Sequence, residues 1–208
     1  MNFDKNQIGK SYRIRSLYFD DYYDSALHEN ESGVDDRKKF RIRVYENPKE
    51  NINLEIKYKL KGKTLKESCP LTMAQYDDIM INNLPFDSNY PKPLMLLYLE
   101  SQTRLMKPKI IVEYERTVFV DFPGNVRVTY DRNISYGDRL EDFFKDRIDL
   151  VPLLPKNIHV LEVKYDEFLP DYTAQLLEIG SLSRTSFSKY YLSRMSAKGE
   201  TIYDNKID

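Results

Sequence analysis

Residues 37–45 restrict the fold of this chain more than any other stretch. Their sequence, RKKFRIRVY, places a basic residue at every odd position from 37 to 43. Because successive side chains of a β-strand point to opposite faces, a strand here has one cationic face and one mainly apolar face. Two interpretations are open at this point. The cationic face is solvated surface, or it is one wall of a binding site for a polyanion.

Several other stretches divide their side chains between two faces in the same way. Two of them repeat one pattern, LEIK at 54–57 and LEVK at 161–164, which puts a carboxylate and an ammonium group on the same face. We expect residues 51–60 to pair with residues 37–45 as an antiparallel hairpin. The full set of expected strands covers residues 12–20, 37–45, 51–60, 64–71, 109–122, 125–131 and 157–165.

Helical patterns lie between these strands and at the end of the chain. Thr72 and Ser188 are expected N-caps, and the expected helices cover residues 24–31, 72–82, 94–106, 138–145 and 170–179 and a last stretch from 188 onward. There is no internal repeat and no Gly/Ser-rich linker. The sequence therefore predicts an α+β fold in a single domain over residues 1–208, with poorly ordered tails at 1–11 and 201–208.

Composition narrows the function classes. A net charge of −1 argues against a protein that coats nucleic acid through a general positive field, so an anion site must be a local group of basic residues. The lone Cys69 excludes a disulfide framework and a Cys-rich zinc site within one chain. No apolar run reaches the roughly 20 residues of a membrane span, and the N-terminus lacks the apolar segment of a signal peptide. We expect a cytoplasmic chain without a membrane segment.

The carboxylates among the cations indicate phosphate chemistry. Strands with one charged face fit either an open sheet with that face in water or a closed barrel with that face inward. A barrel interior rich in Arg and Lys needs an anion inside, because buried like charges are costly. A divalent ion that bridges phosphates needs one or two oxygen ligands, and Glu55 and Glu162 are placed to provide them. A single Glu-x-Lys pair is more often a surface ion pair, so the inference depends on several strands together.

The residues also match a known family. The chain resembles the VTC domain, the polyphosphate polymerase domain of the vacuolar transporter chaperone complex and its bacterial relatives, within the triphosphate tunnel metalloenzymes. The matching stretches follow the family order and cover residues 12–20, 37–45, 54–57, 112–116, 126–131, 161–164 and 185–190.

The resemblance implies an antiparallel β-barrel, or tunnel, flanked by helices and lined by basic residues that hold the triphosphate of ATP. It assigns Glu162 to a manganese or magnesium ion, and Ser188 and Lys189 to phosphate contacts, with Lys66 as a further candidate. The basic residues that match the catalytic cations are Arg41, Arg43, Lys57, Arg116, Arg127 and Lys164.

Two departures from the family pattern bear on the site. The family begins with a strand of the type Arg-x-Glu-x-Lys-Tyr, which does not occur before Tyr12, so we expect one wall of the tunnel to be missing. The superfamily pattern Glu-x-Glu-x-Lys reads Asn53-x-Glu55-x-Lys57 here. This change weakens metal binding from that strand and leaves Glu162 as the main expected ligand.

Three functions share such a site. The first is phosphoryl transfer from ATP to a polyphosphate chain, which needs no side-chain nucleophile. The second is hydrolysis of tripolyphosphate or nucleoside triphosphates, and the third is binding of polyphosphate or inositol phosphates without turnover. We also expect Tyr18 or Tyr190 to be available to stack a nucleotide base. Glu113 and Glu115 have the opposite strand parity from Arg116 and are expected to point outward or to be ion-paired, and not to bind a metal.

Overall fold

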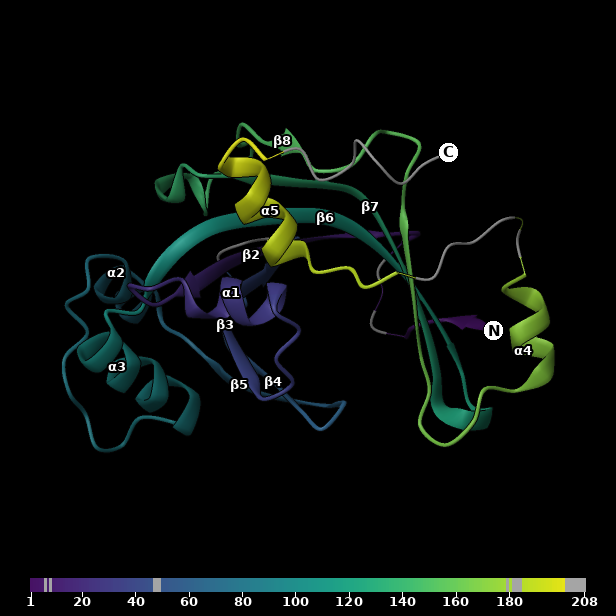
Figure 1. Ribbon diagram of the computed structural model, residues 1–208, viewed down its shortest axis with the longest axis horizontal. Helices are drawn as coiled ribbons and strands as arrows, with labels where there is room; N and C mark the ends of the chain where they lie inside the picture. The colour runs from purple at the N-terminus through teal and green to yellow at the C-terminus, as the bar shows by residue number, and fades with distance from the viewer. Residues whose placement is uncertain (6, 8, 47–49, 179, 181–184, 201–208) are drawn as a thin grey trace.

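The computed structural model describes residues 1–5, 7, 9–46, 50–178, 180 and 185–200. Within them, an antiparallel sheet is flanked by helices on both faces (Figure 1), which confirms the α+β class. The strands are β1 (Asn2–Phe3), β2 (Tyr12–Asp20), β3 (Arg37–Tyr45), β4 (Asn53–Leu60), β5 (Lys63–Pro70), β6 (Lys107–Asp121), β7 (Val126–Gly137), β8 (Val151–Pro152) and β9 (Val160–Lys164). The helices are α1 (Ser25–Glu31), α2 (Met73–Met80), α3 (Lys92–Arg104), α4 (Asp171–Leu176) and α5 (Lys189–Ala197), with short 3-10 turns η1 (Pro123–Asn125) and η2 (Leu140–Asp142).

The strand order is β5-β4-β3-β2-β6-β7, and both β8 and β9 pair with β7. The predicted hairpin is confirmed as β3–β4, in which Arg41 lies opposite Glu55 and Lys39 lies opposite Lys57. The long strands β6 and β7 arch across the molecule (Figure 1) and carry β9 at their far end. The bend gives the sheet a concave inner face and a convex outer face.

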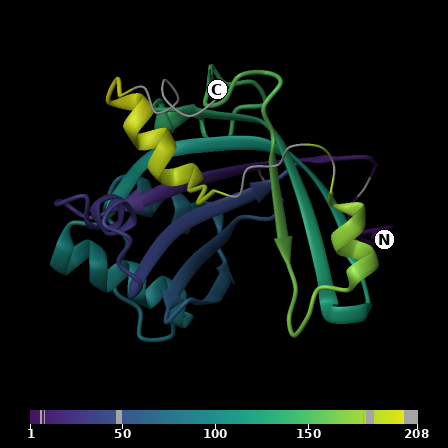
Figure 2. The same cartoon turned by 45° about the vertical axis from the view of Figure 1, so that its right-hand side comes forward.

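The sheet does not close into a hydrogen-bonded barrel. Among the described residues, β5 pairs only with β4, and β9 pairs only with β7. In Figure 2, β9 and the strands β3 and β4 form two arms that are joined through β6 and β7. Lys66 on β5 and Lys164 on β9 share the inner parity, and like charges on facing edges disfavour direct pairing. The expected barrel is therefore an open, strongly curved sheet.

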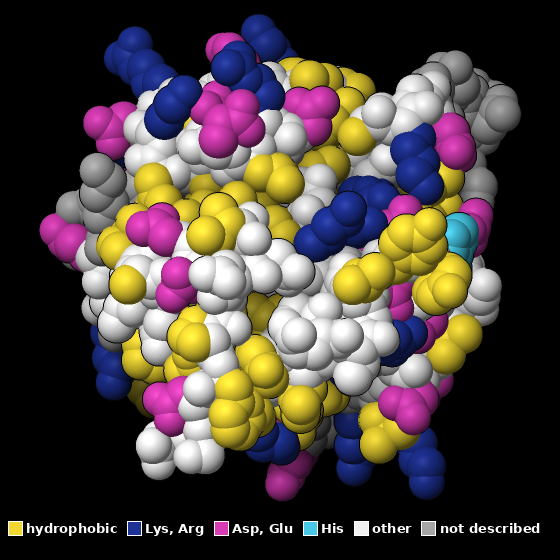
Figure 3. Space-filling view, turned by 90° about the vertical axis from the view of Figure 1, so that its left-hand side faces the viewer, with side chains coloured by type: hydrophobic (Ala, Val, Ile, Leu, Met, Phe, Trp, Pro, Cys, Tyr) yellow, Lys and Arg dark blue, Asp and Glu magenta, His cyan; other side chains and the backbone are white. Residues whose placement is uncertain are grey.

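Alternation along β3 and β4 produces the larger hydrophobic core on the outer face. Phe40, Ile42, Leu54 and Ile56 are at most 1% exposed there, and α2 and α3 cover them. The predicted N-cap of α2 is confirmed, because the Thr72 hydroxyl accepts a hydrogen bond from the backbone N–H of Gln75. The surface over α2 and α3 (Figure 3) mixes hydrophobic side chains with charges of both signs.

The second core lies on the inner face, where β2, β6 and β7 are apolar. Ile14, Val112 and Tyr114 pack there with Leu27 of α1 and Tyr190 of α5. Helices therefore occupy part of the concave face as well as the outside of the sheet. The cationic part of the inner face is left to β3, β4, β5, β9 and the far halves of β6 and β7.

Several boundaries differ from the predicted ones. Helix α3 ends at Arg104 because Leu105 adopts a left-handed conformation (φ 54°), and Pro108 already belongs to β6. The helix expected over 138–145 is only the 3-10 turn η2. Within residues 1–11, β1 pairs with β6 and Asp4 is 8% exposed. Residues 201–208 lie outside the described part of the chain. None of the described helices has both the length and the apolar character needed to cross a bilayer.

Gly124, in the turn between β6 and β7, offers a test of this arrangement. Its φ is 73°, and an added Cβ would lie 2.3 Å from the carbonyl oxygen of Phe168 in the segment after β9. Gly62 has a similar φ of 74° and nothing within 4 Å of such a Cβ. We expect Gly124→Ala to cost about 1–3 kcal/mol more unfolding free energy than Gly62→Ala, because only the former adds a steric clash to the left-handed strain. Urea denaturation of both variants measures the difference, and equal costs would show that the close approach is absent.

Candidate active site

The predicted cations gather on the concave inner face. Pairing places Tyr18 opposite Arg41 and Ser16 opposite Arg43, so β2 and β3 project these side chains on one side. Arg116 lies opposite Asp131 across β6 and β7, and Arg127 lies opposite Lys164 across β7 and β9. The alternation visible in the sequence therefore brings residues from five strands to one surface.

Glu55 is the centre of the first cluster. Its side chain is 3% exposed. Its Oε2 lies 2.6 Å from Arg41 and 3.6 Å from Arg43, while its Oε1 lies 3.0 Å from Lys66 Nζ. Burial by itself would raise the pKa of Glu55, but Arg41 and Arg43 outweigh it and lower that pKa to about 2. Glu55 is therefore a buried counter-ion for three of the predicted site residues.

Asp131 holds the second cluster. Arg116 donates two hydrogen bonds of 2.7 Å to its carboxylate, and Lys189 Nζ lies 2.7 Å from Oδ2. Burial opposes ionisation of Asp131, yet Arg116 and Lys189 lower its pKa overall. Lys189 is the first residue of α5, and Ser188 caps that helix by accepting a hydrogen bond from the Tyr191 N–H. The predicted Ser-Lys pair is thus connected to the sheet through Asp131.

The other predicted residues lie closer to solvent. Arg127 pairs with Asp4 at 2.5 Å, and Lys164 pairs with Glu162 at 3.3 Å. The Glu162 side chain is 41% exposed, and its pKa is lowered because the charges of Lys164, Lys189 and Arg116 outweigh its burial. Glu162 therefore faces the same space as the Asp131 cluster.

Lys57 differs from the arginines because it has no ion pair within 4 Å among the described residues. Lys57 is an exposed residue; partial desolvation of its ammonium group is the main cause that lowers its pKa, and Lys164 lowers it further while Glu162 opposes the shift. These influences come from β9, although Lys57 lies on β4. The two arms of the sheet consequently face each other across one space.

The hydrogen bonds that tyrosine hydroxyls make to the site arginines were not expected from the sequence. The Tyr18 hydroxyl accepts a hydrogen bond of 3.1 Å from Arg41, and the Tyr114 hydroxyl accepts one of 3.2 Å from Arg43. Burial favours the neutral phenol of Tyr18, but Arg41 and Arg43 lower its pKa to about 8. Tyr18 is 6% and Tyr190 is 2% exposed, so burial excludes the expected stacking of a base on either ring. The sequence did show that residues 16, 18 and 20 alternate along their strand and therefore share one face. Pairing places that face beside Arg41 and Arg43.

The charges on the two arms are unequal. In the described part of the chain, the ion pairs of five predicted or neighbouring site cations on β3–β5 involve one carboxylate, Glu55, whereas four site cations on β6, β7, β9 and α5 pair with three carboxylates. The first group is Lys39, Arg41, Arg43, Lys57 and Lys66, and the second is Arg116, Arg127, Lys164 and Lys189 with Asp4, Asp131 and Glu162. An anion in the space between the arms is therefore attracted most strongly to β3–β5.

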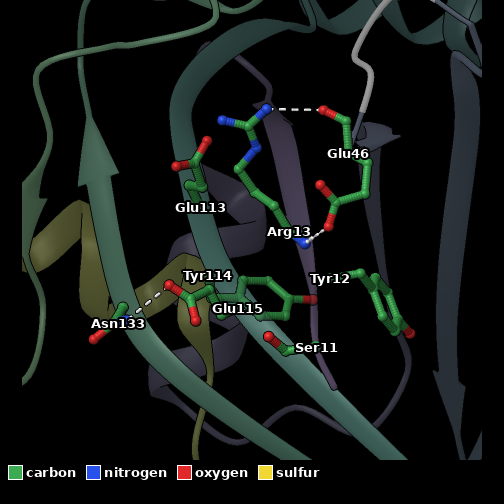
Figure 4. Close-up of a pocket in the computed structure, with 8 residues that line it drawn as sticks. All are labelled: Ser11, Tyr12, Arg13, Glu46, Glu113, Tyr114, Glu115 and Asn133. Atoms are coloured by element: carbon green, nitrogen blue, oxygen red, sulfur yellow. Dashed lines mark hydrogen bonds between the residues drawn. The ribbon is translucent and has the colours of Figure 1, made fainter. Parts of the chain in front are cut away.

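A separate cavity of about 440 Å³ lies near the start of β2 (Figure 4). Its lining includes Arg13 and three carboxylates, Glu46, Glu113 and Glu115. Glu113 pairs with Arg15 at 2.5 Å, and Glu115 accepts a hydrogen bond from Asn133. Both carboxylates therefore point outward and are partnered, as predicted. The acidic lining makes this cavity unsuitable for a polyanion.

Comparison with known proteins identifies the family of this chain. The family model described as the VTC domain matches residues 1–198, so the chain belongs to the VTC domain family. A candidate adenylyl cyclase from Hippeastrum, described as having a dominant triphosphatase activity, is similar in structure with a TM-score of 0.48 at 12% identity. That match covers 93% of this chain and 85% of the other, and likeness at this level supports no argument about activity. The comparison with curated proteins finds no match.

Glu55→Gln tests the counter-ion role of Glu55. Removing one partner of a buried ion cluster leaves Arg41 and Arg43 uncompensated, so we expect a loss of about 3–5 kcal/mol in unfolding free energy at pH 7. The folded-state pKa of Glu55 is lowered to about 2. Its contribution is therefore complete above its ordinary pKa of about 4.3 and disappears as the pH falls toward 2. Chemical denaturation of both proteins at several pH values measures this convergence.

The outward-facing Glu115 supplies the matched control. Its carboxylate is 45% exposed and lies 3.5 Å from Arg132, so Glu115→Gln should change stability much less than Glu55→Gln. Tripolyphosphate should restore part of the stability that Glu55→Gln loses, since it provides negative charge to the same arginines. Equal effects of the two substitutions would contradict the assignment.

Proposed function

We propose that this VTC domain transfers the γ-phosphoryl group of ATP to the end of a polyphosphate chain bound along the inner face of the sheet. The observation that carries this proposal is the excess of cations over carboxylates on β3–β5. A bound polyanion would neutralise the cations that have no carboxylate partner. Membership of the VTC domain family supports the same substrate class.

The arginines are suited to hold the phosphates of the donor. Each guanidinium has five N–H donors, so Arg41 and Arg43 can contact phosphate oxygens while they keep their hydrogen bonds to Tyr18, Glu55 and Ser16. Arg116, Arg127, Lys57 and Lys164 would stabilise the charge that develops during transfer. We assign Lys66, Ser188 and Lys189 to binding of the chain.

A divalent ion fits at Glu162 better than at Glu55. Both Glu55 oxygens are taken by cations, whereas the Glu162 carboxylate is 41% exposed and its only ion pair in the described residues is with Lys164 at 3.3 Å. The described residues contain no group of three or more His, Cys, Asp or Glu that could hold a metal alone. Manganese or magnesium would therefore be held jointly by Glu162 and the phosphates, and would neutralise phosphate charge when bound.

The carboxylates of the site favour transfer to phosphate over transfer to water. Hydrolysis benefits from a general base with a pKa near the working pH. Glu55, Asp131 and Glu162 all have lowered pKa values because cations surround them. The end of a polyphosphate chain is already anionic and needs no deprotonation. The lack of a carboxylate suited to act as a general base is the reason that we favour a polymerase over a triphosphatase.

Incubation of the protein with ATP and manganese or magnesium tests the proposal. We expect polyphosphate to form, and we expect Lys57→Ala and Arg127→Ala to lower the rate by at least about 100-fold, because each removes a cation that stabilises the transferring group. Arg132→Ala is the control, because Arg132 is also a cation on β7 but pairs with the outward-facing Glu115.

The products distinguish the competing functions. Polymer is measured by gel electrophoresis and orthophosphate by a colorimetric assay in the same reaction. Formation of orthophosphate without polymer would contradict the polymerase and indicate a triphosphatase. Tight polyphosphate binding with neither product, unaffected by Glu162→Gln, would replace it by a binding module.

A further inference from the structure

Lys39 lies on the inner face of β3 in an unusual environment for a lysine. Its Nζ donates hydrogen bonds to the side-chain oxygen of Asn30 at 2.5 Å and to the hydroxyl of Ser188 at 3.1 Å. These partners come from α1 and from the N-cap of α5, and neither is charged. The Tyr190 ring centroid lies 5.6 Å from the same atom. Lys39 therefore joins both inner helices to the sheet without forming an ion pair.

The charge of Lys39 is poorly compensated. No carboxylate lies within 4 Å of Lys39 or Lys57 in the described part of the chain, although the two lysines are directly opposite each other on β3 and β4. Burial lowers the pKa of Lys39 to about 8; Tyr18 and Asp20 oppose the shift, and Arg37 and Lys57 add to it. Each arginine farther along β3 at the site has a carboxylate partner in Glu55. Lys39 and Lys57 are thus adjacent cations without a carboxylate partner among the described residues. An anion bound beside them would compensate both charges.

A purely structural role does not explain a lysine at this position. A glutamine could donate to Asn30 and Ser188 without the cost of desolvating a charge. The alternation of β3 also places Lys39 in line with Arg41 and Arg43, at steps of roughly 7 Å along the strand. Lys39 consequently extends the row of arginines by one position toward α1 and α5.

We propose that Lys39 is a further phosphate-binding residue and that Lys39 and Lys57 form a subsite for a phosphate unit beyond those held by Arg41 and Arg43. The subsite would favour linear polyphosphate chains longer than three units over tripolyphosphate. This inference rests on the proposed function, because it extends the same polyanion site.

Calorimetric titration of the protein with tripolyphosphate and with long-chain polyphosphate tests the subsite. Loss of one charge-assisted contact should make Lys39→Met bind the long chain about tenfold more weakly. Binding of tripolyphosphate should change less than about twofold, since it occupies the arginines, and Lys39→Arg should retain the preference for the long chain. Asn30→Ala is the matched control, because it removes a hydrogen bond to Lys39 but leaves the charge.

The outcomes separate this inference from the proposed function. Equal losses for both ligands, no loss in Lys39→Met, or an equal loss in Asn30→Ala would overturn the subsite while leaving the polyanion site intact. Failure of the unmodified protein to bind either ligand would overturn the proposed function and the subsite together. Thermal melts verify folding, and Lys39→Gln, which keeps both hydrogen bonds, replaces Lys39→Met if that variant unfolds.

Discussion

Repulsion between like charges on the concave face is the constraint on which the rest of this structure depends. A sheet that turns basic residues of six strands toward one space cannot bury them without counter-ions. Glu55 and Asp131 supply these counter-ions at 3% and 1% side-chain exposure. Each carboxylate serves more than one cation, so the folded chain keeps an excess of positive charge. That excess makes the inner face suitable for a phosphate polyanion.

The two hydrophobic cores hold different parts of this face in place. The outer core under α2 and α3 fixes the backbone of β3 and β4, whose alternate residues are the site arginines and lysines. The inner core holds α1 and α5 against β2, β6 and β7. Because α5 begins at Lys189 and is capped by Ser188, its packing also positions two of the proposed phosphate contacts. Fold stability and site geometry therefore depend on the same alternation of apolar and charged side chains.

Most of the strands and the parity of their side chains could be predicted from the sequence. Residues 12–20 and 37–45 are strands with the predicted bounds, and Thr72 and Ser188 cap helices as expected. The 3-10 turn η2 and the end of α3 at Leu105 were not predictable in the same way, because local backbone conformation and packing decided them. The family resemblance led us to expect a closed barrel, whereas the sheet is open. Closure depends on pairing between strands that are far apart in the sequence, which local patterns do not determine.

The sequence by itself determined which residues share a face, because the two-residue period of a strand leaves little choice. It therefore placed Arg41 and Arg43 on one face of their strand, and Lys57 and Arg127 on the charged faces of theirs, while the family resemblance joined these faces in one expected surface. Only the tertiary structure decided which carboxylate each cation meets, because those contacts join residues from different strands and helices. Glu55 became a counter-ion and Glu162 stayed exposed although both stand in the same Leu-Glu-x-Lys pattern, since their neighbours differ. The contacts of Lys39 with Asn30 and Ser188 likewise depend on the packing of α1 and α5 against the sheet.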